Sequence, residues 1–208
     1  MVKNVVFDLD GTLVDSLPGI AWSIDAALAE CGLTPRSSLT PQDLKPLIGP
    51  PVRTILATVS GLPDGAELDR LLAAFRRSYD ADGWRKTLLQ PGTMSMLQRL
   101  LAGGCRLWVV TNKPALSSGL ILKGLGVALY FEKTLSPDSR HPPFASKAEM
   151  LLALDLPDAE TIMVGDTEED AHAAAAAGFE CAIVPHGYGT GLETISGWDS
   201  LIATCYAK

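Results

Sequence analysis

Short apolar segments alternate with helical segments along most of this 208-residue chain, and this alternation constrains the fold more than any other feature. The β-branched and aromatic character of residues 5–7, 107–110, 161–164 and 181–184 predicts four buried strands, and residues 129–135 suggest a shorter fifth. Strands that alternate with helices are typical of a parallel sheet with right-handed crossovers. We therefore expect an α/β fold with a doubly wound, Rossmann-like parallel sheet at its core.

One long segment interrupts the alternation directly after the first strand. Throughout residues 16–83 the apolar residues recur at helical spacing, beginning with a helix that starts near Pro18 and stops at Gly32. We interpret this segment as an inserted all-helical cap on a core made of residues 1–15 and 84–208. A cap inserted in this way is expected to act as a mobile lid over a site on the core.

Composition and charge exclude several classes of partner. The formal net charge of −7 argues against broad binding to nucleic acid or to an anionic membrane surface. No apolar run approaches the roughly 18–20 residues of a membrane-spanning helix, and the N-terminus lacks the pattern of a secretory signal. Scattered cysteines without zinc spacing indicate reduced thiols in a cytoplasmic protein: Cys31, Cys105, Cys181 and Cys205. Nothing in the sequence indicates an oligomeric state.

Polar side chains follow three of the predicted strands, at the point where each strand ends. The three segments are Asp8–Thr12, Thr111–Lys113 and Gly165–Asp170. Ligands of open parallel sheets bind at the carboxyl ends of the strands, so these segments are expected to meet at one site. Carboxylates that meet there repel one another unless a cation lies among them. Oxygen ligands in an incomplete cage suit Mg²⁺, which also shares its coordination with substrate phosphate.

The same strand ends carry groups that suit an anion. Thr111 offers a hydroxyl, the backbone amide of Asn112 lies beside it, and a helix is expected to begin just beyond. Gly11 lets the backbone approach a ligand closely. Lys147 follows a polar loop and brings a fixed positive charge. Together these groups predict a phosphate-binding site next to the metal site.

Four of these segments resemble, in order and in spacing, the four motifs of the haloacid dehalogenase superfamily. The first is the run from Phe7 to Ser16, and the second is Val110–Lys113. Lys147 fits the third motif, and Gly165–Asp166 with Asp170 fits the fourth. Within the superfamily the chain is similar to phosphoglycolate phosphatase-like members, which carry a helical cap after the first motif. The segment from Val184 to Gly189 is also similar to that group.

The resemblance implies a role for each carboxylate. Asp8 would be the nucleophile that takes the phosphoryl group, and Asp10 would protonate the leaving oxygen and then activate water. Mg²⁺ would be bound by the side chains of Asp8 and Asp166 and by the backbone carbonyl of Asp10. Asp170 would either bind the metal as an alternative ligand or support the residues that do.

The resemblance also implies that Thr111, the Asn112 amide and Lys147 hold the phosphoryl oxygens. The context of Lys147 departs from the family pattern, because Ala148 follows it where proline is usual. Lys133 is therefore a competitor for the third-motif role. Lys113 either contacts the site directly or serves only at the start of a helix.

The cap holds one further candidate. The loop from Gly49 to Arg53 resembles the substrate-facing loop of capped family members. Arg53 could meet a carboxylate or phosphate of the substrate. A solvated arginine at the start of a helix is the competing interpretation, and the sequence leaves both open.

These features predict a Mg²⁺-dependent phosphatase that acts on a small phosphorylated metabolite, with 2-phosphoglycolate as a plausible substrate. A phosphomutase of the β-phosphoglucomutase type is an alternative, as is a nucleotidase or pyrophosphatase on the same scaffold. A non-catalytic member that kept the fold for binding is the hypothesis from another class. The intact set argues against that last hypothesis: Asp8, Asp10, Lys147 and Asp166.

Overall fold

The computed structural model describes residues 2–34, 40–48 and 51–206. The chain divides into two compact units, a core unit of residues 1–15 and 89–208 and a helical unit of residues 16–88. The sequence-based boundary was placed five residues earlier, at Gly83. The 3₁₀ turn η2 (Gly83–Lys86) packs on α1 (Leu17–Cys31) and therefore belongs to the helical unit, which ends at Leu88.

The core unit is built on a five-stranded parallel sheet in the order β5-β4-β1-β6-β7. The strands are β1 (Asn4–Phe7), β4 (Arg106–Val110), β5 (Lys133–Leu135), β6 (Thr161–Gly165) and β7 (Glu180–Ile183). β1 lies at the centre, and Phe7 is in register with Val109 of β4 on one side and with Val164 of β6 on the other. The predicted α/β fold with a parallel sheet is confirmed.

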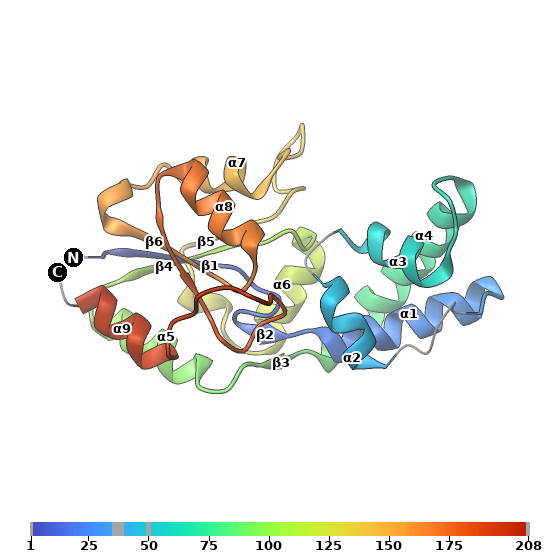
Figure 1. Ribbon diagram of the computed structural model, residues 1–208, viewed down its shortest axis with the longest axis horizontal. Helices are drawn as coiled ribbons and strands as arrows, with labels where there is room; N and C mark the ends of the chain where they lie inside the picture. Colours follow the sequence, from blue (N-terminus) through green and yellow to red (C-terminus); the bar gives the residue numbers. More distant parts are fainter. Residues whose placement is uncertain (1, 35–39, 49–50, 207–208) are drawn as a thin grey trace. The chain divides into compact units, whose positions relative to one another are not determined.

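Helices cover both faces of this sheet (Figure 1). Their bounds are α5 (Thr93–Ala102), α6 (Ala115–Gly124), α7 (Lys147–Leu152), α8 (Glu168–Ala177) and α9 (Trp198–Tyr206), and the 3₁₀ turns are η3 (Ala128–Tyr130) and η4 (Asp158–Glu160). Alternate strand residues such as Val6, Val110 and Met163 join one buried cluster under α7 and α8. Small side chains at Ala173 and Ala174 let α8 lie close to the sheet. Burying each large apolar side chain contributes about 1.5–3 kcal/mol, so this two-sided core holds the strand ends in place.

The helical unit contains α1, α2 (Pro41–Leu44), η1 (Lys45–Leu47), α3 (Val52–Ser60), α4 (Ala66–Ala81) and η2. α1 ends at Gly32, whose left-handed φ of 68° closes the helix. It packs along α4 and against η2, where a Cβ on Gly19 would lie 2.3 Å from the carbonyl oxygen of Gly83. Among the described residues of this unit only Leu88 belongs to a strand, in the two-stranded pair β2 (Val14–Asp15) with β3 (Leu88–Leu89).

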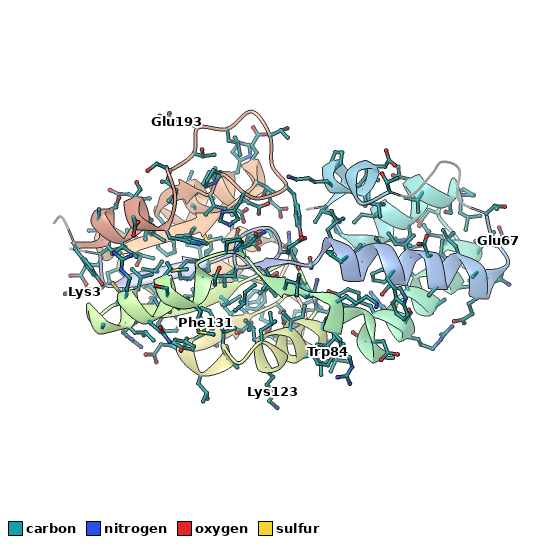
Figure 2. The ribbon with its side chains drawn as sticks, turned by 90° about the horizontal axis from the view of Figure 1, so that it is seen from below. Lys3, Glu67, Trp84, Lys123, Phe131 and Glu193 are labelled. Carbon is teal, nitrogen blue, oxygen red and sulfur yellow. The ribbon has the colours of Figure 1, made fainter. Side chains whose placement is uncertain are left out.

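The side chains fill the interior of each unit, whereas labelled charged residues such as Lys3, Glu67 and Lys123 extend outward (Figure 2). Phe131 instead lies beside the core strands, with its ring edge-on to Phe7 at a centroid distance of 6.4 Å. In the part of the chain that is described, no helix is both long enough and apolar enough to cross a membrane.

Candidate active site

Three strands of the core unit deliver polar side chains to one edge of the sheet. Asp8 follows β1, Thr111 follows β4 and Asp166 follows β6. The sheet pairing extends to two of these residues, since the Asp8 N–H donates to the Val164 carbonyl at 2.8 Å and the Thr111 N–H donates to the Leu135 carbonyl at 3.0 Å. The Asp166 N–H instead donates to Asp170 Oδ2 at 3.1 Å. All three are buried, with exposed fractions of 5%, 1% and 2%. The predicted meeting of strand ends is therefore present, and its backbone is fixed by the sheet.

Three carboxylates gather at this edge. Asp8, Asp166 and Asp170 each offer a carboxylate oxygen, and these atoms all lie within 4.8 Å of one another. The ammonium of Lys147 lies among them, 2.8 Å from Asp8 Oδ1 and 2.6 Å from Asp170 Oδ1. One ammonium facing three carboxylates leaves an excess of two negative charges, which a divalent cation would neutralise.

Burial makes this charge arrangement costly. It raises the pKa of the Asp8 carboxyl well above its usual range, although Lys147 opposes the shift. Burial also raises the pKa of Asp166 to about 6, although a hydrogen bond from the Tyr188 N–H lowers it. For Lys147 burial disfavours the charge, but the carboxylates of Asp8 and Asp170 raise the pKa of the ammonium above its usual range. The site therefore favours uptake of positive charge, as a proton or as a cation.

Asp170 is held on both oxygens by the protein itself. Its Oδ1 accepts from Lys147, and its Oδ2 accepts from the Asp166 N–H at 3.1 Å, the Thr167 N–H at 3.0 Å and the Thr167 hydroxyl at 2.8 Å. With Thr167 it forms the capping box that starts α8. A Cβ on Gly165 would lie 2.3 Å from the Asp170 Cβ, so the strand end accommodates Asp170 closely. This geometry favours a supporting role for Asp170 over direct metal binding.

Asp10 is paired with Lys113. The Lys113 ammonium lies 3.0 Å from Asp10 Oδ1 and 2.9 Å from Oδ2, and the two side chains are only 8% and 19% exposed. Gly11, directly after Asp10, has a φ of 86°. It approaches Asp166 so closely that a Cβ on it would lie 2.2 Å from Asp166 Oδ2. The contact that the sequence left open for Lys113 is thus to Asp10.

The expected phosphate-binding groups are only partly as predicted. Lys147 lies beside Asp8, whereas its competitor Lys133 is exposed on β5. The Thr111 hydroxyl accepts from the Lys113 N–H at 3.2 Å, which leaves its own proton for a ligand. One donor of the helix start beyond Asn112 is used within the protein, because the Ala115 N–H, the first of α6, donates to Asp138 at 2.9 Å.

A sequence model of haloacid dehalogenase-like hydrolases matches residues 5–184, and this range contains every carboxylate of the site. The chain belongs to this family. Its phosphatases generally use a divalent metal ion, and the buried acidic triad fits one. The match with its phosphatase members makes this family member a phosphoric monoester hydrolase.

Several known proteins resemble this family member over nearly its whole length. A phosphoglycolate phosphatase of Xanthomonas campestris pv. campestris (strain 8004) is 34% identical over 206 residues, which are 95% of this chain and 90% of that protein. A predicted phosphoglycolate phosphatase from Haemophilus somnus 129PT has a TM-score of 0.79 at 27% identity, covering 99% of this chain and 91% of that one. Mycobacterium tuberculosis Protein Tyrosine Kinase A has a TM-score of 0.80 at 31% identity, covering 99% and 98%.

Arg53 of this haloacid dehalogenase-like hydrolase lies in the helical unit, at the second residue of α3. Its guanidinium donates to Asp64 through Nε at 2.9 Å and to Asp69 through Nη1 at 2.7 Å, both within the same unit. The loop residues Gly49 and Pro50 that precede it lie outside the described residues. These pairs agree with the interpretation of Arg53 as a helix-start arginine at the surface.

Three hydrogen bonds of the site go beyond the sequence-based expectations, which placed Asn112 here as a phosphate donor and assigned no role to Glu169, Thr12 or Tyr188. Asn112 donates through its side chain to Glu169 Oε1 at 2.8 Å. Thr12 donates through its hydroxyl to Asp166 Oδ1 at 3.3 Å, and the backbone N–H of Tyr188 donates to Asp166 Oδ2 at 2.6 Å. For Tyr188 the sequence offered two signals, the family resemblance of its segment and the glycines on either side of it, but neither identified Asp166 as its partner. Glycines next to an aromatic residue after a strand indicate a close backbone approach.

Proposed function

We propose that this protein is a Mg²⁺-dependent phosphatase that hydrolyses a small phosphate monoester, 2-phosphoglycolate being the first candidate, through a phosphoryl group carried on Asp8. The observation that carries this proposal is the buried contact of Asp8 with Lys147 inside a carboxylate triad. The phosphoglycolate phosphatase names of the relatives support the substrate. The small phosphorylated metabolite is the only partner proposed, and a cytoplasmic location remains a prediction.

The chemistry needs two displacements at phosphorus. In the first, a carboxylate oxygen of Asp8 bonds to phosphorus while the bond to the ester oxygen breaks, and Asp10 gives that oxygen its proton. In the second, Asp10 takes a proton from water, the water oxygen bonds to phosphorus, and the bond to Asp8 breaks to release inorganic phosphate. Lys113 holds both oxygens of Asp10, so it fixes the direction in which this carboxyl faces.

Charge on the phosphoryl oxygens is the main obstacle to the attack of one anion on another. Lys147 offers a fixed ammonium beside Asp8, and the Thr111 hydroxyl and the Asn112 backbone N–H, which follow β4, are the further donors proposed for these oxygens. Asp170 keeps the Lys147 ammonium in place, because its Oδ1 accepts from that group at 2.6 Å. These contacts act on the transferring group in both displacements.

The residues fit a bound Mg²⁺ ion. Asp8 and Asp166 would hold it with their side chains and Asp10 with its backbone carbonyl, while Asp170 would support the set through Lys147 and the turn after β6. When bound, Mg²⁺ supplies positive charge that neutralises the phosphoryl oxygens and the excess of carboxylates. This cancels the cost that burial imposes on Asp8 and Asp166.

We propose that the helical unit, residues 16–88, is the cap that decides which ester is hydrolysed. The strand ends of the core hold groups for phosphate and metal, and they leave few side chains to recognise the remainder of a substrate. The described residues of the cap include Arg53 as the sequence-derived candidate, although its guanidinium already contacts Asp64 and Asp69.

The direct test is phosphate release from a panel of substrates, with Mg²⁺ and with excess EDTA. The panel contains 2-phosphoglycolate, a hexose 1-phosphate, a nucleoside monophosphate and pyrophosphate. Because one structural relative is named a tyrosine kinase, the panel also contains ATP with a tyrosine peptide. We expect Mg²⁺-dependent release that is fastest from a small monoester. Isomerised sugar phosphate or a phosphorylated peptide in place of free phosphate would overturn the assignment of water as the acceptor.

A further inference from the structure

A segment after the last strand of the sheet reaches back to the metal-binding edge. It comprises His186, Gly187, Tyr188 and Gly189, and we call it the Asp166 brace. The brace begins beyond residues 5–184, the part of the chain that the family model matches. All four of its residues lie directly against Asp166 or against the loop after β1.

The Asp166 carboxylate is oriented by two donors, one on each oxygen. The backbone N–H of Tyr188 donates to Oδ2 at 2.6 Å, and the Thr12 hydroxyl donates to Oδ1 at 3.3 Å. Asp166 is 2% exposed and Tyr188 is 6% exposed, so water competes little for these bonds. A carboxylate held in this way presents its remaining lone pairs in a fixed direction.

The glycines of the brace allow this approach. A Cβ on Gly187 would lie 2.1 Å from the Asp166 Cβ, and a Cβ on Gly189 would lie 2.1 Å from the Asp166 backbone oxygen. Any side chain at either position would therefore displace Asp166 or the brace. Neither glycine has a φ in the left-handed region, so the requirement for glycine comes from space and not from backbone conformation.

Side chains of the brace anchor it to the loop that carries Asp8 and Asp10. The Tyr188 hydroxyl donates to Asp15 Oδ1 at 2.9 Å, and His186 Nε2 lies 3.0 Å from the Thr12 carbonyl oxygen. The ring of His186 also lies edge-on to Trp198, at a centroid distance of 5.1 Å. The brace thus connects the segments after β1 and β6, which both contribute to the proposed metal site.

We infer that the Asp166 brace positions the Asp166 carboxylate for a divalent cation and thereby sets the metal affinity of the enzyme. This inference rests on the proposed function, because it assumes a divalent cation at the carboxylate triad. Gly187 and Tyr188 are positioning residues in this account. They act through Asp166 and do not touch the substrate.

The test measures Mn²⁺ binding to the protein by electron paramagnetic resonance, with the metal alone as probe. Gly187→Ala pushes a methyl group into Asp166, and we expect its Kd to rise about 10–100-fold. Tyr188→Phe keeps the ring and the backbone donor but loses the bond to Asp15, and we expect a smaller rise, on the order of 3–10-fold. Raising the Mg²⁺ concentration restores the kcat of Tyr188→Phe, because the loss lies in metal affinity.

Two matched variants control for the substitutions themselves. Gly119→Ala adds a methyl group on α6 where no atom lies within 4 Å. Tyr130→Phe removes a hydroxyl whose partner is the exposed Gln98. Both controls keep the metal affinity of the unsubstituted protein. If Gly187→Ala does not fold, as shown by circular dichroism, Tyr188→Phe alone decides the outcome.

The result separates the inference from the function on which it rests. Binding that requires Asp166 but is unchanged in Gly187→Ala and Tyr188→Phe overturns the brace and leaves the phosphatase proposal intact. Binding that is unchanged in Asp166→Asn overturns the metal site, and with it this inference. In the metal-free protein, hydrogen exchange gives a separate readout. The Tyr188 amide is protected in the unsubstituted protein and loses protection in Asp166→Ala, whereas equal exchange in the two proteins contradicts the contact.

Discussion

The ammonium of Lys147 lies 2.8 Å from Asp8 Oδ1, and both side chains are almost completely buried. The ammonium also contacts Asp170, so one cation serves two carboxylates while Asp166 lies close by. Such a group is weak as a source of stability, because desolvation of the charges offsets their attraction. The chemistry proposed for Asp8 explains the presence of this buried charged group.

Removing Lys147 tests the charge arrangement. Lys147→Met leaves Asp8 and Asp170 buried without their cation, and we expect the metal-free protein to lose about 3–5 kcal/mol of unfolding free energy. Urea denaturation measures this loss. Lys133→Met is the matched control, because Lys133 is exposed on the same unit and should cost little. Equal stability of the two variants would show that Lys147 is not the partner of the triad.

The shifted pKa of Asp166 predicts how metal binding depends on pH. Burial raises this pKa from 3.8 to about 6, and a protonated carboxyl does not bind a divalent cation. We expect the affinity for Mn²⁺ to fall as pH drops through about 6, with proton release on binding. Titration calorimetry in buffers of different ionisation enthalpy measures those protons. An affinity that does not change across this window would contradict the shift.

The same shift sets the sign of a stability change in the metal-free protein. Between about pH 4 and pH 6 the folded protein binds more protons at Asp166 than the unfolded chain does. Its unfolding free energy therefore falls as pH rises through this window, and Asp8 contributes in the same direction. Asp166→Asn, which does not titrate, should show a shallower fall in denaturation experiments. A fall as steep as that of the unsubstituted protein would assign it to other groups.

The contacts of Arg53 predict a small effect on catalysis. Its guanidinium is held by Asp64 and Asp69, both exposed and both in the helical unit. We expect Arg53→Ala to change kcat/KM by less than about twofold for both 2-phosphoglycolate and p-nitrophenyl phosphate, as is usual for an exposed ion pair. A large loss confined to the ester that carries a carboxylate would instead make Arg53 a substrate-recognition residue.

The strand ends of the core could be predicted because local pattern and topology agree there. Asp8 and Asp166 each follow a short buried run of apolar residues, and a parallel sheet brings the ends of such runs together. The presence of Lys147 at the site was predicted from the family resemblance and from the polar loop that precedes it. The separation of the helical segment was also visible, since helical periodicity replaces strand-like runs directly after Asp15.

Contacts between loops could not be predicted in this way. Tyr188 is 22 residues away from Asp166, in a segment without periodicity, so no pattern connects the two. The bond from Ala115 to Asp138 joins the start of α6 to a distant loop, and it uses a helix-start donor that the sequence offered to phosphate. Arg53 acquires Asp64 and Asp69 only when α3 packs beside the start of α4. Each of these contacts depends on tertiary packing that local sequence does not encode.

The central claim is that Asp8 carries the phosphoryl group, and trapping that group tests it most directly. Asp10→Asn can neither protonate the leaving oxygen nor activate the water, so the variant is given p-nitrophenyl phosphate, whose leaving group needs no proton. A phosphorylated enzyme should then accumulate in the presence of Mg²⁺. Mass spectrometry after acid quenching should then find one added phosphoryl group on the peptide that contains Asp8. The same treatment of the Asp8→Asn, Asp10→Asn double variant should give none. A phosphoryl group on any other residue, or none in the Asp10→Asn variant while it still releases phosphate, would contradict the account.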